Sequence, residues 1–564
     1  MEFFDLKDIT DCGDIYTDIC IVGSGPAGST IAKEMRNSGI DVCLVESGGL
    51  NSESDTQALY DIENVGAVRK MPQELVRQRI FGGSSTTWSG RCASFNSIDF
   101  EKRKWIPNSG WPFNVETITP YVERASDYLG LGPHIYDESL FDLFNSENPT
   151  PKIDKNLLKP TFWQFSKSNR NASNNPVIFG QDLLKTDVPN FRIFIHANLM
   201  HINTDEAGNK VNSLDFKSLE GNKLRIFAKS VVLCCGGVEN ARLLLASNKI
   251  LPEGVGNQND MVGRNLMDHV GAVIGTFNPF NSSKAQSRFG RYWLDNGGTR
   301  HSYLHGLSLS EKIQAEEKLL NAAAFLEEYV SPNDPWHALK RVVTRLVKGK
   351  SSDANLLDNE NMFWRDEHSA DSTSNKVSFN NDLMQVCKNF PSILGNLYRK
   401  NIIKRPPITQ NSRVDLYALV EQAPHRDSRI TLSTQTDALG IPLSKINWKI
   451  DENERATAKR LGELIAAELK RIGMPVPELA QWLYTGEDWR ASFTDRAHPT
   501  GSTRMSTNPK EGVVDSNCNV HGVEGLYIAG SSTFPTAGHA NPTLMIVAMA
   551  IRLADWLKTI DYKV

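Results

Sequence analysis

The chain has 564 residues, of which 40% are hydrophobic and 23% charged, a composition typical of a globular protein with two or more domains. Its formal net charge of -4 argues against a nucleic-acid partner and favours a small neutral substrate over a polyanion. The eight cysteines show no C-x-x-C pair and no zinc spacing, so we expect reduced thiols and no metal site.

The N-terminus, MEFFDLKDITDCGDIYTD, carries acids where a secretory signal needs a basic flank and a long apolar run. No apolar stretch elsewhere is long enough to form a transmembrane segment. These two observations predict a cytoplasmic protein.

The segment IVGSGPAGSTIAKEMRNSGIDVCLVESGG (21–49) predicts a strand, a turn, a helix and a second strand. The apolar run 19–22 stops at a glycine, helical periodicity covers 27–35, and 41–45 is a second apolar run. This order is the beginning of a doubly wound α/β domain.

Three glycines in this segment, Gly23, Gly25 and Gly28, have the G-x-G-x-x-G spacing. They allow a tight turn, a close backbone approach to a pyrophosphate, and close helix packing. Glu46 ends the second strand, about 20 residues past the glycines, where its carboxylate would accept hydrogen bonds from both ribose hydroxyls and exclude NADP. These residues alone leave NAD and FAD both open.

Three further segments carry a family resemblance: RQRIFGGSSTTWSGRCASFNSIDFEKRKW (77–105), GGVENARLLLAS (236–247) and AHPTGSTRMSTNPKEGVVDSNCNVHGVEGLYIAGSSTFPTAGHANPTLMIVAMAIRLADWL (497–557). They resemble the glucose-methanol-choline (GMC) family of FAD-dependent oxidoreductases. Within that family the sequence is more similar to bacterial sugar and polyol dehydrogenases and to pyranose oxidase than to choline or glucose oxidase. The resemblance implies FAD as the cofactor.

The resemblance also implies two catalytic residues. His498, in HPTGSTRM, matches the family histidine that receives the alcohol proton while hydride leaves to flavin N5. An imidazole near its unperturbed pKa can do this at neutral pH. Asn541 matches a position that holds Asn or a second His, and its amide would position the substrate oxygen. We interpret His539, His521 and His425 as structural.

The expected flavin contacts are carried over by position. Ser85-Thr86-Thr87-Trp88 stands where some relatives attach FAD to a histidine, and since Thr87 cannot form that bond, a non-covalent FAD is expected. Cys92, nearby, is interpreted as a packed thiol. The residues expected to contact the isoalloxazine, the phosphates or the adenine are Gly83, Ser84, Ser85, Leu199, Gly530 and Ser531.

A C-terminal apolar helix is predicted with Asn541 as its N-cap and Pro542 at its first position. Its positive end, with Pro542 and Thr543, would face the flavin N1 and C2 carbonyl, where negative charge gathers on reduction. An ordinary buried helix with a good cap explains the apolar pattern equally well.

The flavin motifs lie in separated parts of the chain, which predicts a discontinuous FAD-binding domain of residues 1–110, 191–275 and 495–564. Residues 111–190 and 276–494 would form the substrate domain. The fold class expected from the resemblance is therefore α/β: a Rossmann-like FAD-binding domain with an α+β substrate domain on a large antiparallel sheet.

Within the substrate domain, 413–422 and 428–433 alternate as half-buried strands should, and 451–473 predicts an amphipathic helix. Glu421 would bind a substrate hydroxyl, modulate His498, form an ion pair, or simply be an edge residue of its strand. The segment 331–376 joins a basic amphipathic helix to a polar tract; a solvated face is the usual interpretation, with membrane or partner docking the rarer one, and we expect a surface excursion or a lid near the entrance.

The leading functional hypothesis is FAD-dependent oxidation of a CH–OH group in a small hydroxylated substrate: a sugar, glycoside or polyol. The electron acceptor, which could be oxygen, a quinone or a carrier protein, stays open. Two alternatives on the same fold are a redox-neutral FAD-containing lyase and a sterol-type alcohol oxidase.

Overall fold

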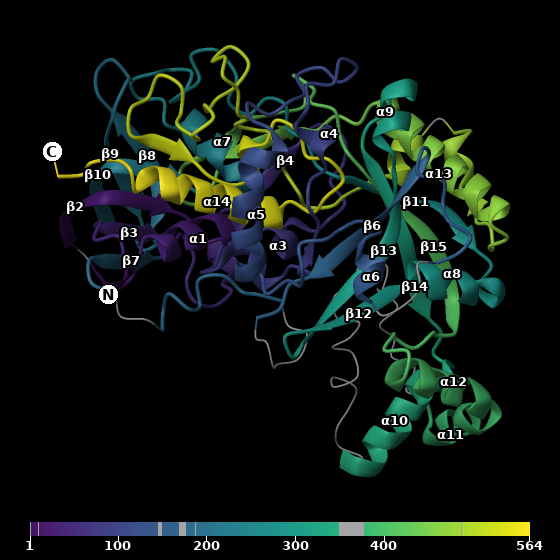
Figure 1. Ribbon diagram of the computed structural model, residues 1–564. Coiled ribbons are helices and arrows are strands. Elements are labelled where there is room, and N and C mark those ends of the chain that lie inside the picture. The colour runs from purple at the N-terminus through teal and green to yellow at the C-terminus, as the bar shows by residue number, and fades with distance from the viewer. Residues whose placement is uncertain are drawn as a thin grey trace.

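The computed structural model describes the chain except residues 1, 10, 145–148, 169–175, 186–187, 349–376, 487 and 564. Two large sheets lie beside each other, and three helices, α10 to α12, project away from the second sheet (Figure 1). The apolar core is continuous between the two sheets, from Ile21 in the first to Val420 in the second.

The first sheet has the order β1-β7-β3-β2-β10-β9-β8, with β20 beside β10. Pairing is parallel from β1 to β10 and to β20, and antiparallel among β10, β9 and β8. Helix α1 (Pro26–Glu34) packs against α14 (Thr543–Leu557), which packs against α5 (Val115–Tyr128). The strands are β1 (Glu2–Asp5), β2 (Asp11–Val22), β3 (Val42–Val45), β7 (Phe191–Ile195), β8 (Asn198–Thr204), β9 (Val211–Lys217), β10 (Lys223–Leu233) and β20 (Leu526–Ile528).

The predicted strand, glycine turn, helix and second strand are all present as β2, α1 and β3. All four residues of β3 are buried, as expected for an apolar strand inside a parallel sheet. This part of the sequence carries its own structural signals, and it forms the Rossmann-like half of the predicted fold class.

The second sheet is antiparallel throughout, with the order β18-β11-β15-β14-β13-β6-β5, and with β12 on β13 and β19 on β11. Helix α13 (Glu452–Arg471) begins with a capping box of Asp451 and Glu454 and packs on β11, β14 and β15. The strands are β5 (Arg91–Cys92), β6 (Leu158–Phe165), β11 (Val270–Phe277), β12 (Arg291–Asn296), β13 (Thr299–Leu309), β14 (Ala322–Val330), β15 (Asn411–Val420), β18 (Glu478–Leu479) and β19 (Thr494–Asp495). The predicted fold class, a Rossmann-like domain joined to a large antiparallel sheet, is confirmed.

A third, small sheet joins distant parts of the chain: β16 (Arg429–Thr436) pairs with β17 (Pro442–Asn447), which pairs in parallel with β4 (Ile62–Asn64). The predicted strands 413–422 and 428–433 thus belong to two different sheets, because β15 joins the large one and β16 the small one. The remaining helical elements are α2 (Ser54–Ala58), α3 (Gln73–Val76), η1 (Gly83–Thr86), α4 (Ser97–Phe100), α6 (Leu140–Leu143), α7 (Gly236–Ala246), η2 (Pro279–Asn281), α8 (Ser283–Phe289), α9 (Glu311–Glu317), α10 (Pro335–Lys348), α11 (Phe379–Lys388), α12 (Phe390–Asn401), η5 (Gln481–Leu483), η6 (Trp489–Ser492) and η7 (Ser531–Thr533).

Two elements cross the predicted domain boundaries. Helix α5 follows residue 111 in sequence but packs against α14 on the Rossmann side, and β11 starts at Val270 yet pairs within the second sheet. Within the described ranges, no helix is both long and apolar enough to cross a bilayer.

Candidate active site

A cavity of about 430 Å³ is lined by residues from both ends and the middle of the chain. It runs from the glycine turn after β2, past α7, to the start of α14 and the end of β15. Except for Gly28 and Gly530, every residue that the sequence singled out for cofactor binding or catalysis lines it: Gly23, Gly25, Glu46, Gly83, Ser84, Ser85, Leu199, His498, Ser531, Asn541, Pro542 and Thr543.

The glycine turn forms a close cradle at one wall of this cavity. Gly23 has a φ of +100°, and a Cβ on Gly28 would lie 1.8 Å from the Gly23 carbonyl oxygen, so Gly28 serves helix packing behind the wall. A Cβ on Gly83 would lie 2.9 Å from the Gly25 Cα. Since the N-terminus of α1 has no side-chain cap, its first N–H groups are available to an anion, and the cradle fits a pyrophosphate.

Glu46 lies on an adjoining wall of the cavity and is buried, with 5% of its surface exposed. One carboxylate oxygen accepts hydrogen bonds from the Ser24 N–H (2.9 Å) and hydroxyl (2.6 Å), and the other from the Gly48 N–H at 2.9 Å. Leu199, the second residue of β8, lies on the same cavity. The carboxylate is therefore fixed at the end of β3, where the fingerprint requires an acceptor.

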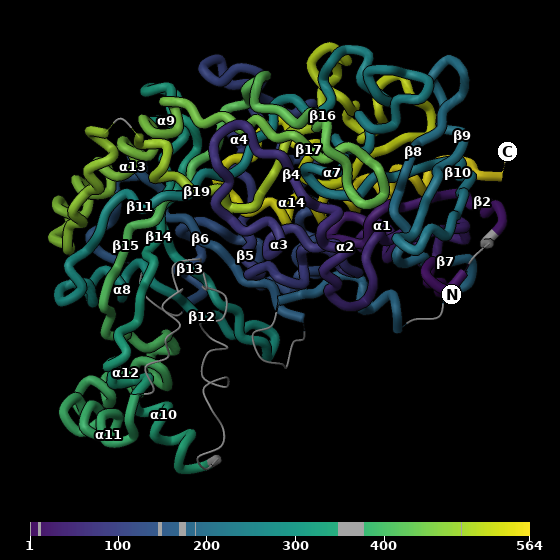
Figure 2. Tube along the Cα trace, turned by 180° about the vertical axis from the view of Figure 1, so that it is seen from behind, coloured from purple at the N-terminus to yellow at the C-terminus, as the bar shows by residue number. Residues whose placement is uncertain are grey.

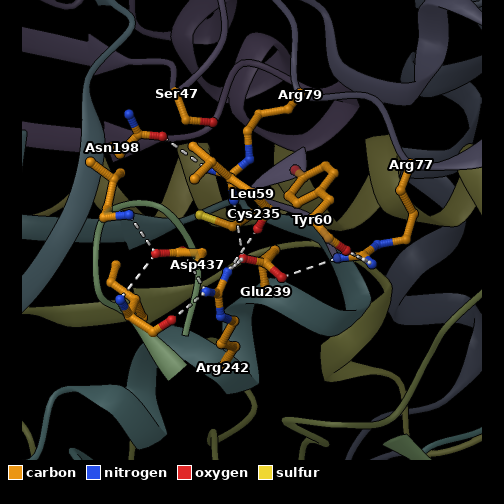
Figure 3. Close-up of polar contacts among 12 residues, drawn as sticks. Ser47, Leu59, Tyr60, Arg77, Arg79, Asn198, Cys235, Glu239, Arg242 and Asp437 are labelled. Carbon is orange, nitrogen blue, oxygen red and sulfur yellow. Dashed lines mark hydrogen bonds and ion pairs between the residues drawn. The ribbon is translucent and has the colours of Figure 1, made fainter. Parts of the chain in front are cut away.

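A buried ion cluster lies beside Glu46 and was not predicted. Glu239, on α7, accepts from Arg77 (3.0 Å), Arg79 (3.2 Å) and Arg242 (3.0 Å), as Figure 3 shows. Arg242 also donates to Asp437 at 2.6 Å. These five residues line the cavity, so a rigid polar wall is built from segments far apart in sequence.

Burial alone would raise the pKa of Glu239, but the charges of Arg242, Arg79 and Arg77 outweigh it and hold this pKa below its usual value. Glu239 and Arg242 stand three residues apart in GGVENARLLLAS, which indicates one helix face. No local sequence signal links Glu239 and Arg242 to Arg77 and Arg79.

His498 is placed by a strained backbone. Ala497, just before it, has a φ of +57°, in the left-handed region. The buried carboxylate of Asp268 accepts from the N–H groups on either side, Arg496 at 3.2 Å and His498 at 3.0 Å, and pairs with Arg69 at 2.7 Å. These bonds hold the unfavourable turn in place.

The imidazole of His498 contacts a second histidine. Nδ1 of His269 lies 2.9 Å from Nδ1 of His498, and Nε2 of His269 lies 2.9 Å from the Gly538 carbonyl oxygen and 3.3 Å from that of Ala537. Because carbonyl oxygens only accept, His269 Nε2 carries a hydrogen, and its Nδ1 accepts when the ring is neutral. The hydrogen-bond network therefore assigns the hydrogen of neutral His498 to Nδ1 and leaves the lone pair on Nε2.

Both rings favour the neutral form. Burial lowers the pKa of His269, and burial together with the neighbouring His269 ring and the Arg496 and Arg91 charges lowers the pKa of His498 well below its usual value. The expectation of an unperturbed His498 pKa is corrected, because burial and nearby cations oppose protonation.

Asn541 faces the lone pair of His498, with Nδ2 3.4 Å from Nε2. Its Oδ1 is buried and has no hydrogen-bond partner among the described residues. The prediction that Asn541 caps the C-terminal helix is wrong: α14 begins at Thr543 with Pro542 at the cap position and no side-chain cap. The uncapped positive end of α14 borders the cavity.

Other predicted residues lie around this site. Glu421 is fully buried and pairs with both terminal nitrogens of Arg103, so the ion-pair alternative is the observed one. Cys92 is fully buried, as its interpretation as a packed thiol requires. Gly530 has a φ of +112° and leads into Ser531, whose hydroxyl donates to the Pro499 carbonyl at 2.8 Å. Among the described side chains, no group of three His, Cys, Asp or Glu residues is placed to hold a metal ion.

Comparisons with known proteins agree with this geometry. Two models described as GMC oxidoreductase match residues 182–271 and 424–550, and an FAD binding domain model matches residues 16–59. These matches cover the Rossmann turn, the part of the first sheet from β7 to β10 with helix α7, and the segments that carry His498 and Asn541.

Full-length similarity extends to curated proteins and to a solved structure. The fructose dehydrogenase large subunit of Gluconobacter japonicus is 22% identical, over 96% of this chain and 97% of that protein. The 2-methyl-1,2-propanediol dehydrogenase of Mycolicibacterium austroafricanum is 21% identical, over 96% and 95%. A crystal structure of formate oxidase superposes with a TM-score of 0.54 at 17% identity, covering 97% and 99% of the two chains, which shows a shared fold. The chain thus matches both the N-terminal and the C-terminal domain model of the GMC oxidoreductases, together with an FAD binding domain.

Proposed function

We propose that this enzyme oxidises a CH–OH group of a sugar, glycoside or polyol, with His498 as the base. The observation that carries the proposal is the hydrogen-bonded series Gly538 carbonyl, His269, His498, which leaves the Nε2 lone pair of His498 on the wall of the cavity. A neutral imidazole with a fixed tautomer is the form that can accept a proton.

His498 and Asn541 have different proposed roles in binding the substrate hydroxyl. The 3.4 Å contact between Asn541 Nδ2 and His498 Nε2 is long and weak, so a substrate hydroxyl can replace it. The hydroxyl would donate to His498 Nε2 and accept from Asn541 Nδ2, which fixes its direction. As the carbinol becomes a carbonyl, the hydroxyl proton moves to His498 Nε2. FAD, held by the glycine cradle and Glu46, would supply the oxidant for the hydride that leaves the carbinol carbon.

The relatives support the substrate class. Proteins named for the oxidation of fructose and of a propanediol match this chain over nearly its whole length. A protein named C-glycoside 3-oxidase, from Arthrobacter globiformis, is 31% identical over 148 residues. Polyhydroxylated compounds are therefore our proposed substrates.

We further propose that FAD binds non-covalently along the cradle, with Glu46 on its ribose. Thr87 lines the cavity and cannot attach a flavin. We also propose that the FAD-binding domain comprises residues 1–110, 191–275 and 495–564 together with α5, which packs on its side of the molecule. A cytoplasmic location is part of the same proposal.

The decisive experiment is an anaerobic titration of the purified enzyme with sugars, glycosides, polyols and simple alcohols, followed by visible absorption. Bleaching of the flavin by one class would establish oxidation and identify that class, and His498→Ala is the control in which bleaching should be roughly 10²–10⁴-fold slower. Readmitting air, or adding a quinone analogue, would identify the acceptor class.

A flavin that stays oxidised with every sugar and polyol would overturn the proposal. Conversion of a substrate without bleaching would identify a redox-neutral lyase. Bleaching by sterols alone would identify a sterol-type oxidase.

A further inference from the structure

The helices α10, α11 and α12 form an arm that stands apart from both sheets in two opposite views (Figures 1 and 2). The arm, defined here as residues 335–348 and 377–405, leaves the sheet after Val330 of β14 and returns at Asn411 of β15, which are paired. The other end of these strands, at Leu419, lines the active-site cavity. Strands of nine or ten residues span about 30 Å, so α10 lies about one strand length from Leu419, as the surface excursion of the two expected alternatives and not as a lid over this wall. The rest of the segment expected to be an excursion or a lid, residues 349–376, lies outside the described residues.

The arm exposes an apolar stripe on each helix. On α10 the stripe follows the i, i+3, i+4 spacing of one helix face: Val343, Leu346 (70% exposed) and Val347 (75% exposed). Half of the exposed large apolar side chains in the described residues belong to this arm: Val343, Leu346, Val347, Phe379, Leu383, Met384, Phe390, Leu394, Leu397, Tyr398, Ile402 and Ile403.

The contact between α10 and α11 has charged groups at its centre. Asp382 of α11 is fully buried and accepts from Arg341 (2.6 Å) and Arg345 (2.9 Å) of α10. An ordinary helix pair turns its apolar stripes inward. In this pair an ion cluster is inside and the apolar stripes face outward, so the stripes are available to an external partner.

The charge of the arm is opposite to that of the whole protein. The arm carries nine Lys or Arg residues and one acid, Asp382, whereas the chain has a formal charge of -4. The cations are Lys340, Arg341, Arg345, Lys348, Lys388, Arg399, Lys400, Lys404 and Arg405. Arg341 and Arg345 pair with Asp382 inside the arm and Arg399 donates to Ser287, so the exposed Lys388 and Lys404 are the cations placed beside the stripes. Apolar stripes on short helices flanked by Lys and Arg are the pattern of helices that lie in a lipid headgroup layer.

We propose that this arm docks the enzyme on an anionic lipid surface, with the apolar stripes entering the headgroup layer. A protein interface is the competing occupant, but interface cores are depleted in lysine, and lysines border these stripes at Lys388 and Lys404, both exposed. The proposal does not depend on the substrate or on the role of His498.

The test is co-sedimentation of the full-length, FAD-loaded enzyme with vesicles of phosphatidylcholine alone and of phosphatidylcholine with phosphatidylglycerol. We expect binding to the anionic vesicles that falls as salt is raised. Two variants, Leu346→Ser/Val347→Ser/Leu394→Ser and Lys388→Gln/Lys404→Gln, should each bind about ten-fold less. Phe280→Ser removes an apolar side chain that is 88% exposed outside the arm and should bind like the parent.

Flavin content and melting temperature should be unchanged in all three variants, because the altered side chains are exposed. Failure of the parent enzyme to bind anionic vesicles would overturn the proposal. So would equal binding to both vesicle types, or equal loss in the Phe280 control. A dimer detected by light scattering that the arm variants dissociate, without vesicle binding by the parent, would identify a second copy as the occupant.

Discussion

Nδ1 of His269 and Nδ1 of His498 lie 2.9 Å apart and share one hydrogen. Because neutral His269 has a single N–H and donates it from Nε2 to the Gly538 carbonyl, the shared hydrogen belongs to His498. This relationship fixes the proton-accepting atom of the proposed base as Nε2, on the cavity side. Each histidine therefore has a different expected effect when it is replaced.

Replacing His498 by Ala removes the proposed base. The rate of flavin reduction by substrate should fall by roughly 10²–10⁴-fold, the usual contribution of a general base. FAD should stay bound, because the cradle of Gly23, Gly25 and Gly83 is untouched. Anaerobic stopped-flow absorption measures both quantities, and reduction at the parental rate would show that another group takes the proton.

Replacing His269 tests a positioning role. In His269→Ala the Nδ1–H of His498 loses its acceptor, so both tautomers become accessible and kcat should fall by about 10–100-fold with little change in KM. His269→Gln can still accept from His498 through its amide oxygen and donate to the Gly538 carbonyl, so it should recover part of the rate. Equal losses in the Ala and Gln variants, accompanied by a lower melting temperature, would indicate a purely structural role.

The lowered pKa of His498 predicts a pH profile. Since the base is already neutral well below pH 6.5, flavin reduction should be constant across neutral pH and decline only in acid. Asn541→Asp would place a carboxylate beside Nε2 and raise the pKa of His498 towards neutrality, so its rate should increase as pH rises through 7. A pH profile that matches that of the parent enzyme would show that residue 541 does not influence the pKa of His498.

Glu46 tests the cofactor half of the site. Glu46→Ala removes the carboxylate proposed to hold the ribose, and because hydrogen bonds to charged groups contribute about 1.5–3 kcal/mol, FAD should bind about ten- to a hundred-fold more weakly. Flavin content after desalting and titration of the apoenzyme measure this loss. The exposed Glu253, changed to Gln, is the control for charge alone. Unchanged flavin affinity would show that Glu46 does not bind the ribose.

The sequence predicted the parts of the site whose signal is local. The spacing of Gly23, Gly25 and Gly28 and the acid at Glu46 lie within one β-α-β unit, so strand and helix periodicity locate them. His498 and Asn541 came from a motif resemblance. His269 is 229 residues from His498 in sequence, and no period or spacing connects them, so only the folded sheet reveals the contact.

The cap predicted for the last helix shows a different limit. Asn541 before a proline is a good N-cap pattern, yet its side chain contacts His498 and leaves the helix end bare. The same residue type satisfies a local rule and a tertiary contact, and the sequence cannot distinguish them. The lowered pKa of His498 could not be predicted from the sequence either, because the burial of the ring and its closeness to the Arg496 charge arise only from the fold.

The wall around Glu239 gives the last prediction. Glu239→Gln removes the charge that faces Arg77, Arg79 and Arg242; Arg242 keeps Asp437, but Arg77 and Arg79 are left with a neutral partner. Removing one partner from a buried ion pair typically costs about 3–5 kcal/mol, so the melting temperature should fall clearly and FAD should dissociate more easily. Excess FAD should restore part of the melting temperature, since a ligand that binds only the folded state stabilises it. Glu253→Gln again serves as the control, and a Glu239→Gln variant that melts with the parent would show that Asp437 alone can balance the cluster.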